Sequence, residues 1–137
     1  MTSPALRFHF IGLVVADMPA SLAFYRALGL DIPAGDDALP HVEVTLPGGP
    51  LLVLDTVGTV RSFDPEWTAP TGGHRAALAF MCADPAAVDK LYGELVAAGH
   101  TGHLPPWDAF WGQRYAVVHD PDGNGVDLMA PLPDAAQ

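Results

Sequence analysis

The chain has 137 residues, half of them hydrophobic and 16% charged, which is enough apolar material for one compact domain or two small fused modules and excludes a disordered chain. No apolar run approaches the length of a membrane span, about 20 residues, and the first residues lack the pattern of a signal peptide. A single cysteine excludes an internal disulfide. We therefore expect a cytoplasmic protein with no membrane contact. The formal net charge is −10 and the six Lys and Arg are scattered, so we expect no nucleic-acid partner.

The first half opens with an apolar run of strand length that ends at Asp17, and Pro19 follows within the first turn of an expected helix. Asp is a favoured N-cap and Pro is tolerated at the start of a helix. Apolar residues then recur at helical spacing up to Leu28, and Gly29 is suited to end the helix. We therefore predict a strand followed by a helix.

Three further strands are predicted after this helix, at residues 30–33, 41–46 and 51–55. The last two are joined by a tight turn at residues 47–49, where Gly supplies the positive φ that such turns require. The first half therefore reads as strand, helix, strand, strand, strand.

The second half repeats this pattern. An apolar run ends at Asp84, Pro85 follows, and a helical apolar pattern runs to a stop at Gly99. Strands are predicted at residues 101–104, 115–119 and 125–129, the last two joined by a turn at 120–124 that holds Gly and Asn. Superposing the two Asp caps also superposes further pairs: Tyr25 on Tyr92 and Leu28 on Leu95.

The repeat divides the chain into a first module at residues 1–57, a linker loop at 58–73 and a second module at 74–137. One such module is too small to bury its sheet well, so we expect two modules side by side or two chains together. The predicted fold class is α+β. A single α+β domain with coincidental similarity between its halves is the competing interpretation.

The order and spacing of these pieces resemble the vicinal-oxygen-chelate superfamily, which includes glyoxalases, bleomycin resistance proteins and extradiol dioxygenases. The most specific pieces are the runs 14–17, 24–25, 28–29, 111–115 and 120–128. The resemblance implies tandem βαβββ modules whose curved mixed sheets enclose a cavity. It also implies a homodimer, with modules exchanged between the chains or not.

Many members of this superfamily bind a divalent metal in the cavity. The resemblance places their ligand positions at Phe10 on the first strand, Ala77 on its repeat, Asp127 on the last strand, and Leu52 as the first-module counterpart of Asp127. Three ligands from His, Glu, Asp or Cys are the usual minimum for a catalytic divalent site. One carboxylate is too few, so we predict no metal and no other cofactor, as in the metal-free resistance proteins.

The alternation of strand side chains predicts what lines the cavity instead. Apolar and small residues dominate, polar groups come from the strand 41–46 and from Asp127, and aromatic residues gather in a linker segment and in a loop at 105–111. Aromatic faces stack on flat conjugated ligands. The candidate ligand-binding residues are Phe10, Val14, His41, Glu43, Leu52, Leu54, Trp67, Ala77, Met81, Trp107, Phe110, Trp111, Tyr115, Asp127 and Met129.

The leading hypothesis is a metal-independent protein that sequesters a hydrophobic or aromatic natural product, with antibiotic resistance by drug binding as its role. No residue is assigned a catalytic role in this interpretation. The alternative is an enzyme of the same fold, a lyase, isomerase or dioxygenase acting on a small organic substrate. It would be either a metal-dependent lyase with unusual ligands or a metal-free isomerase with His41, Glu43 or Asp127 as acid and base. A third is a regulator whose ligand changes its dimer contacts.

Overall fold

A computed structural model describes residues 6–133, which form two compact units divided between Pro70 and Thr71. The expectation about a signal peptide falls mostly on residues 1–5, which lie outside the described residues, as do the outer ends of both predicted modules.

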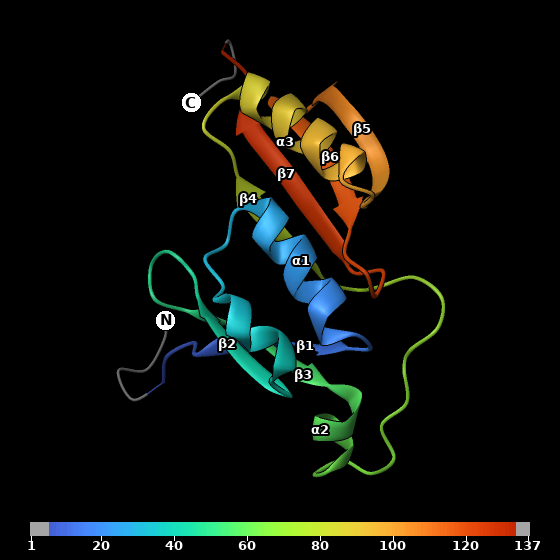
Figure 1. The fold of residues 1–137 in the computed structure, drawn as a ribbon. Coiled ribbons are helices and arrows are strands. Elements are labelled where there is room, and N and C mark those ends of the chain that lie inside the picture. The colour runs from blue at the N-terminus through green and yellow to red at the C-terminus, as the bar shows by residue number, and fades with distance from the viewer. Residues whose placement is uncertain (1–5, 134–137) are drawn as a thin grey trace. The chain divides into compact units, whose positions relative to one another are not determined.

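The first unit is a mixed three-stranded sheet with two helices and a 3₁₀ turn (Figure 1). The strands lie in the order β1-β3-β2, with β1 parallel and β2 antiparallel to the central β3. Helix α1 packs against β3. In chain order the elements are β1 (Phe10–Val15), α1 (Met18–Leu28), η1 (Ala34–Ala38), β2 (His41–Thr45), β3 (Leu51–Thr56) and α2 (Val57–Arg61).

Two expectations for the first unit are wrong. Residues 30–33 form no strand, because the Arg26 side chain binds this segment back to α1: its Nε and Nη2 donate to the carbonyls of Ile32 (2.9 Å) and Pro33 (2.6 Å), and Nη1 pairs with Asp37 at 2.8 Å. The linker also begins as a helix, α2, whose first turn is capped by the Thr56 hydroxyl.

The second unit is a four-stranded sheet in the order β4-β7-β6-β5, with α3 along one face (Figure 1). Strand β4 pairs in parallel with β7, and the other two pairings are antiparallel. In chain order the elements are β4 (Ala77–Met81), α3 (Pro85–Ala97), β5 (Thr101–Ala109), β6 (Gln113–His119) and β7 (Gly125–Pro131).

Strand β5 is longer than the sequence predicts and includes most of the expected loop at 105–111. Two prolines lie inside it, which is compatible with a strand at the edge of the sheet, where a missing N–H need not break a ladder. The pairing with β6 shifts register twice, between Gly102 and Leu104 and between Leu104 and Trp107. These irregularities accommodate the prolines and allow the strand to continue to Ala109.

The predicted helix boundaries are confirmed by their caps. The Asp17 carboxylate accepts from the amide of Ala20 at 3.1 Å, and that of Asp84 accepts from the amide of Ala87 at 2.8 Å. Gly29 follows α1 with φ of 120°, a conformation that favours glycine. Both halves therefore start their helices by the same side-chain chemistry.

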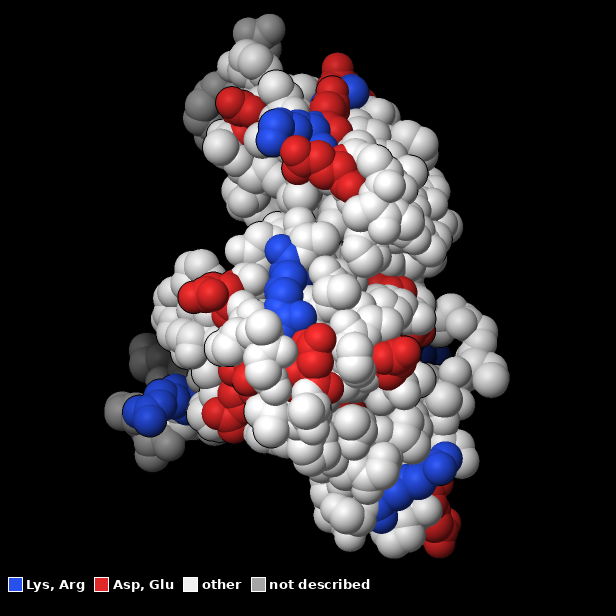
Figure 2. Space-filling model, in the orientation of Figure 1, with Lys and Arg blue, Asp and Glu red and all other residues white. Residues whose placement is uncertain are grey.

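The core of each unit lies between its sheet and its long helix. Leu22 and Tyr25 of α1 are fully buried with Leu52 in the first unit, and Val88 and Leu95 of α3 are fully buried with the central strands of the second. Within residues 6–133 no helix is long and apolar enough to cross a membrane. On the face drawn in Figure 2 the basic side chains stand apart from one another, and several lie beside acidic ones.

Candidate functional site

In the first sheet, the cross-strand register places one set of side chains opposite the helix-covered core. His41, Glu43 and Thr45 of β2 are exposed, whereas Val42 and Val44 between them are buried. Since directly paired residues share a face, this side of the sheet extends across β3 and β1, where Val53 is itself buried. We call this surface the polar face; it comprises His41, Glu43, Thr45, Leu51, Val53, Asp55, Phe10, Gly12 and Val14.

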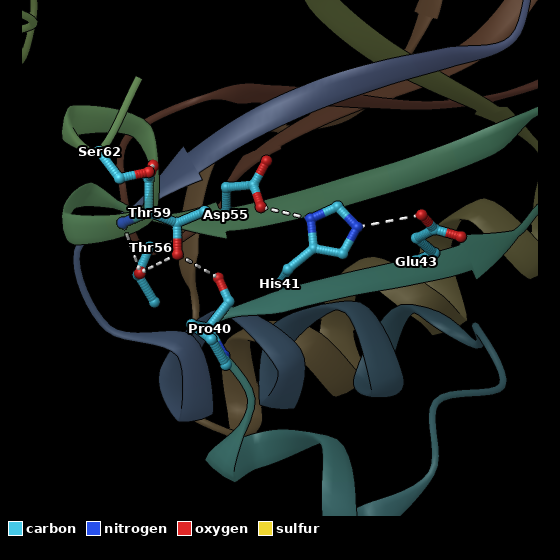
Figure 3. Close-up of polar contacts among 7 residues, drawn as sticks. All are labelled: Pro40, His41, Glu43, Asp55, Thr56, Thr59 and Ser62. Atoms are coloured by element: carbon cyan, nitrogen blue, oxygen red, sulfur yellow. Dashed lines mark hydrogen bonds and ion pairs between the residues drawn. The ribbon is translucent and has the colours of Figure 1, made fainter. Parts of the chain in front are cut away.

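His41 is held between two carboxylates on the polar face (Figure 3). Its Nδ1 lies 2.5 Å from Oδ1 of Asp55, directly across on β3, and its Nε2 lies 3.0 Å from Oε2 of Glu43 on its own strand. The hydrogen bonds to Glu43 and then Asp55 raise the pKa of His41 above 6.5 despite partial burial. The two carboxylates thus stabilise the charged imidazole, which has a donor at each nitrogen, relative to the neutral one.

The start of α2 fixes the chain next to this histidine. The Thr59 hydroxyl donates to the carbonyl of Pro40 at 3.0 Å, and the Thr56 and Thr59 hydroxyls lie 2.9 Å apart (Figure 3). The amide of Thr56 also donates to the carbonyl of Pro40. These bonds tie the start of β2 to the end of β3, and so hold His41 opposite Asp55.

In the second sheet, the register defines a corresponding surface, which we call the aromatic face. The opposite face packs under α3, with Ala116, Val118, Val126 and Leu128 fully buried. On the aromatic face Asp127 of β7 lies between Ala79 of β4 and Val117 of β6. The face comprises Ala77, Ala79, Met81, Gly125, Asp127, Met129, Gln113, Tyr115, Val117, His119 and Trp107, the partner of Tyr115 on β5.

Tyr115 and Asp127 form a hydrogen-bonded pair in the middle of this face. The Tyr115 hydroxyl donates to Oδ2 of Asp127 across the β6–β7 ladder. Burial, and next the hydrogen bond to this carboxylate, raise the pKa of Tyr115 to about 12. The phenol therefore stays protonated at neutral pH and acts as a hydrogen-bond donor.

Three aromatic rings meet at one end of the aromatic face. The centroid of Tyr115 lies 5.5 Å from Trp107 and 5.2 Å from Trp111, and the two indoles lie 6.2 Å apart. All three pairs are edge-to-face, which suits the quadrupoles of the rings. The Trp111 indole N–H donates to Gln113 at 2.9 Å and fixes that ring. We call Trp107, Trp111 and Tyr115 the aromatic corner.

The other predicted ligand-binding residues lie on several different surfaces. Phe10 and Val14 lie on the polar face, and Ala77, Met81 and Met129 lie on the aromatic face, as strand alternation predicts. Phe110 adjoins Trp111 edge-to-face and is 97% exposed. Trp67 lies after α2, under the guanidinium of Arg61, and is not part of the aromatic corner. Whether any of these residues binds a ligand stays a prediction.

The predicted orientation of Leu52 and Leu54 is wrong. They pair with Val44 and Val42, are fully buried, and share the core face of the first sheet. The parallel registers show why: Gly12 pairs with Val53 as Ala79 pairs with Asp127. The first-unit counterpart of Asp127 is therefore Val53, one residue from the predicted Leu52, and a shift of one residue reverses the face of a strand.

The divalent metal that the resemblance implies does not fit the side chains at these positions. Phe10, Ala77 and Val53 offer no donor atom, and the carboxylate of Asp127 accepts the Tyr115 hydroxyl. No group of three or more His, Cys, Asp or Glu within residues 6–133 is arranged to hold a metal ion. A divalent ion needs about three such ligands, and the donor set supplies one.

A cluster of three histidines at the aromatic face is not predicted by the sequence. His119 lies stacked on His103 with ring centroids 4.4 Å apart, and His74 approaches its edge at 6.0 Å. The Nε2 of His119 is buried and has no hydrogen-bond partner among the described residues. Burial, and next the charges of the other two histidines, lower the pKa of His119 below 6.5. No sequence signal joins these residues, because they come from three separate segments.

Comparison with known proteins agrees with this fold. A family model described as the Glyoxalase/Bleomycin resistance protein/Dioxygenase superfamily matches residues 7–128. An uncharacterised protein of Mycobacterium bovis is 29% identical over 134 residues, covering 94% of this chain and 84% of its own length. A Mycobacterium tuberculosis relative has the same identity, with 75% of its length covered.

Solved structures are similar over most of the chain. A glyoxalase/bleomycin resistance protein/dioxygenase family enzyme from Burkholderia phytofirmans has a TM-score of 0.77 at 22% identity, with 90% of this chain and 97% of that one covered. TioX from Micromonospora has a TM-score of 0.63 at 21% identity, with 92% and 99% covered. The matched span and the two repeated sheets together show that the chain belongs to the Glyoxalase/Bleomycin resistance protein/Dioxygenase superfamily.

Proposed function

We propose that this protein binds a hydrophobic, aromatic small molecule without a metal and sequesters it, as a resistance protein does with a natural-product antibiotic. The observation that carries this proposal is the aromatic corner. Trp107, Trp111 and Tyr115 meet on one sheet face, and Trp111 remains 48% exposed. Ring stacking contributes about 0.5–1.5 kcal/mol per pair beyond area burial, so several rings favour a planar ligand.

The donor set supports a metal-independent mode of binding. Phe10, Ala77 and Val53 are apolar at positions where metal-using relatives place ligands, and Val53 is buried. We expect elemental analysis of the purified protein to find no stoichiometric Zn²⁺, Ni²⁺, Fe²⁺ or Mn²⁺. About one such ion per chain, lost in Asp127→Ala, would contradict this part of the proposal.

The direct test is a titration of planar polycyclic natural products, followed by quenching of tryptophan fluorescence. We expect at least one to bind, and Trp107→Ala or Trp111→Ala to weaken it. If none binds more tightly than about 100 μM, which corresponds to roughly 5–6 kcal/mol, sequestration is wrong. Binding that is indifferent to all three Trp would also contradict it.

A second candidate function is an enzyme that uses the polar face. The observation in its favour is His41, which Asp55 orients at Nδ1 while Glu43 occupies Nε2. An imidazole with these partners can donate a proton from Nε2 if a substrate displaces the exposed Glu43. Consumption of a bound ligand by the wild type, lost in His41→Gln, would favour this function over sequestration.

We also propose that the protein acts as a homodimer. Large apolar side chains are exposed: Phe63 at 73%, Met81 at 64% and Phe110 at 97%. Exposed apolar surface of this kind is a common sign of association. Sedimentation at micromolar concentration should give twice the mass of the chain, and a monomer there would refute this.

A further inference from the structure

The electrostatics of the aromatic corner favour a positively charged ligand over a negatively charged one. The polar groups of two of its three rings are already occupied, since the Tyr115 hydroxyl donates to Asp127 and the Trp111 indole N–H donates to Gln113. What the rings leave for a ligand is their faces, which are electrostatically negative. A cation over such a face is attracted by about 0.5–2 kcal/mol, more as it loses water.

Asp127 adds a full negative charge beside these rings. Among the described residues no Lys, Arg or His forms an ion pair with it, and its one hydrogen bond is from the neutral Tyr115. The nearest cation in sequence, Arg114, belongs to the opposite face, where it is bound by Asp89 at 2.9 Å and Asp108 at 3.0 Å. The carboxylate therefore lacks a protein counter-ion.

The whole chain acts in the same direction. Its formal net charge is −10, which raises the local concentration of cations and lowers that of anions in the surrounding solution. This long-range term is screened by salt, whereas the contact between a ligand and Asp127 is screened less. The two contributions can thus be separated by experiment.

We propose that the aromatic corner and Asp127 select ligands in which a flat apolar body carries a protonated or quaternary amine. The rings hold the body, and the amine lies beside the carboxylate at the Tyr115 end of the corner. This inference rests on the proposed function and names the charge class of its ligand. It assigns Asp127 the role of a specificity-determining residue.

The test uses four probes that share one naphthalene ring and differ in charge. They are 1-naphthylmethylamine, its trimethylammonium analogue, 1-naphthalenemethanol and 1-naphthoate, titrated calorimetrically into the full chain at neutral pH. We expect the amine to bind about 10-fold more tightly than the alcohol, and the naphthoate to bind most weakly. The quaternary probe should keep most of the advantage, because attraction to ring faces and to the carboxylate needs no N–H.

Two variants and a control locate the effect. Asp127→Asn keeps an acceptor for the Tyr115 hydroxyl and should weaken the amine about 10-fold while changing the alcohol by less than about 2-fold. Trp111→Leu keeps apolar bulk but removes a ring face, so it should weaken both cations more than the alcohol. Asp31→Asn changes the net charge equally at an exposed carboxylate in the first unit, and should leave the preference intact.

The outcomes separate this inference from the proposed function. If the alcohol binds as tightly as the amine, or if Asp127→Asn weakens both equally with its melting temperature unchanged, the inference is wrong and sequestration stands. An equal loss of preference in Asp31→Asn would assign the effect to net charge and overturn the role of Asp127. Absence of binding by all four probes would overturn both proposals.

Discussion

The two sheets place different chemistry at matching positions of the same register. In the first, Gly12, Val53 and Glu43 form one row across the strands; in the second, that row is Ala79, Asp127 and Val117. The carboxylate of this row, Glu43, lies on the edge strand β2 in the first sheet, whereas Asp127 lies on the inner strand β7 in the second. In the second unit it lies next to aromatic rings instead of a histidine.

The neighbouring row completes the difference. It holds His41 opposite Asp55 in the first unit and Tyr115 opposite Met129 in the second. His41 lies between the two carboxylates Asp55 and Glu43, whereas the described partner of Asp127 is the neutral phenol of Tyr115. The repeated scaffold therefore gives its two faces different partners for their carboxylates: a basic side chain in the first unit and a neutral hydrogen-bond donor in the second.

The largest expected effect tests which residues belong to these faces at all. Leu52→Ala should destabilise the fold by about 2–5 kcal/mol, because Leu52 is fully buried on the core face and its truncation leaves a cavity. Phe10→Ala, on the polar face with 47% of its surface exposed, should cost less than about 1 kcal/mol. Urea unfolding measures both. If Leu52→Ala is as stable as the wild type but binds ligand poorly, Leu52 lines the ligand site and not the core.

The next effect contrasts the tryptophans of the two units. Trp107→Ala and Trp111→Ala should each cost a bound planar ligand about 1–3 kcal/mol, the usual range for an aromatic anchor in a desolvated pocket. Trp67→Ala serves as the matched change in the first unit, since Trp67 contacts Arg61 instead of the corner, and should cost less than about 0.5 kcal/mol. Fluorescence or calorimetric titration measures the affinity of each variant. A loss of affinity in Trp67→Ala alone would show that the ligand does not bind at the aromatic corner.

A smaller effect concerns pH and the second unit. The pKa of His119 is lowered in the folded chain, so above its ordinary value of 6.5 the neutral ring causes no loss of stability. As the pH falls from 6.5 through the folded pKa, the unfolded chain takes up a proton that the folded chain rejects, and stability decreases. Unfolding free energies measured above and below pH 6.5 should show this decrease in the wild type and a flatter dependence in His119→Gln. An unchanged slope would show that other groups cause it.

The smallest effect has the opposite sign and belongs to the first unit. The pKa of His41 is raised, so its contribution is complete below 6.5 and is lost as the pH rises through the folded pKa. Nearly half of this side chain is exposed, so solvent screening limits the contribution to about 0.5 kcal/mol. His41→Gln should remove the loss at rising pH, and Glu43→Gln should reduce it. A wild type and His41→Gln with parallel pH profiles would contradict the pairing.

Local patterns in the sequence were sufficient for the repeat, both helices and their caps. Asp17 and Asp84 accept hydrogen bonds from amides three residues ahead, and such contacts depend only on nearby residues. Strand alternation likewise placed His41 and Glu43 on one face, and Asp127 and Met129 on another. The sequence also shows that Phe10 and Ala77 have no side-chain atom that could ligate a metal.

Tertiary structure alone decided how the strands are aligned and which distant residues meet. The parallel register that pairs Val53 with Gly12 joins strands separated in the chain by α1 and β2, and an error of one residue there turned Leu52 and Leu54 to the wrong face. Arg26 binds the carbonyls of Ile32 and Pro33, and the segment 30–33 forms no strand. Pairing of β5 with β6 brought Trp107 to Tyr115, and His103 to His119. Such contacts join segments far apart in the chain, so no periodicity or local propensity encodes them; they follow from the free energy of packing the whole unit.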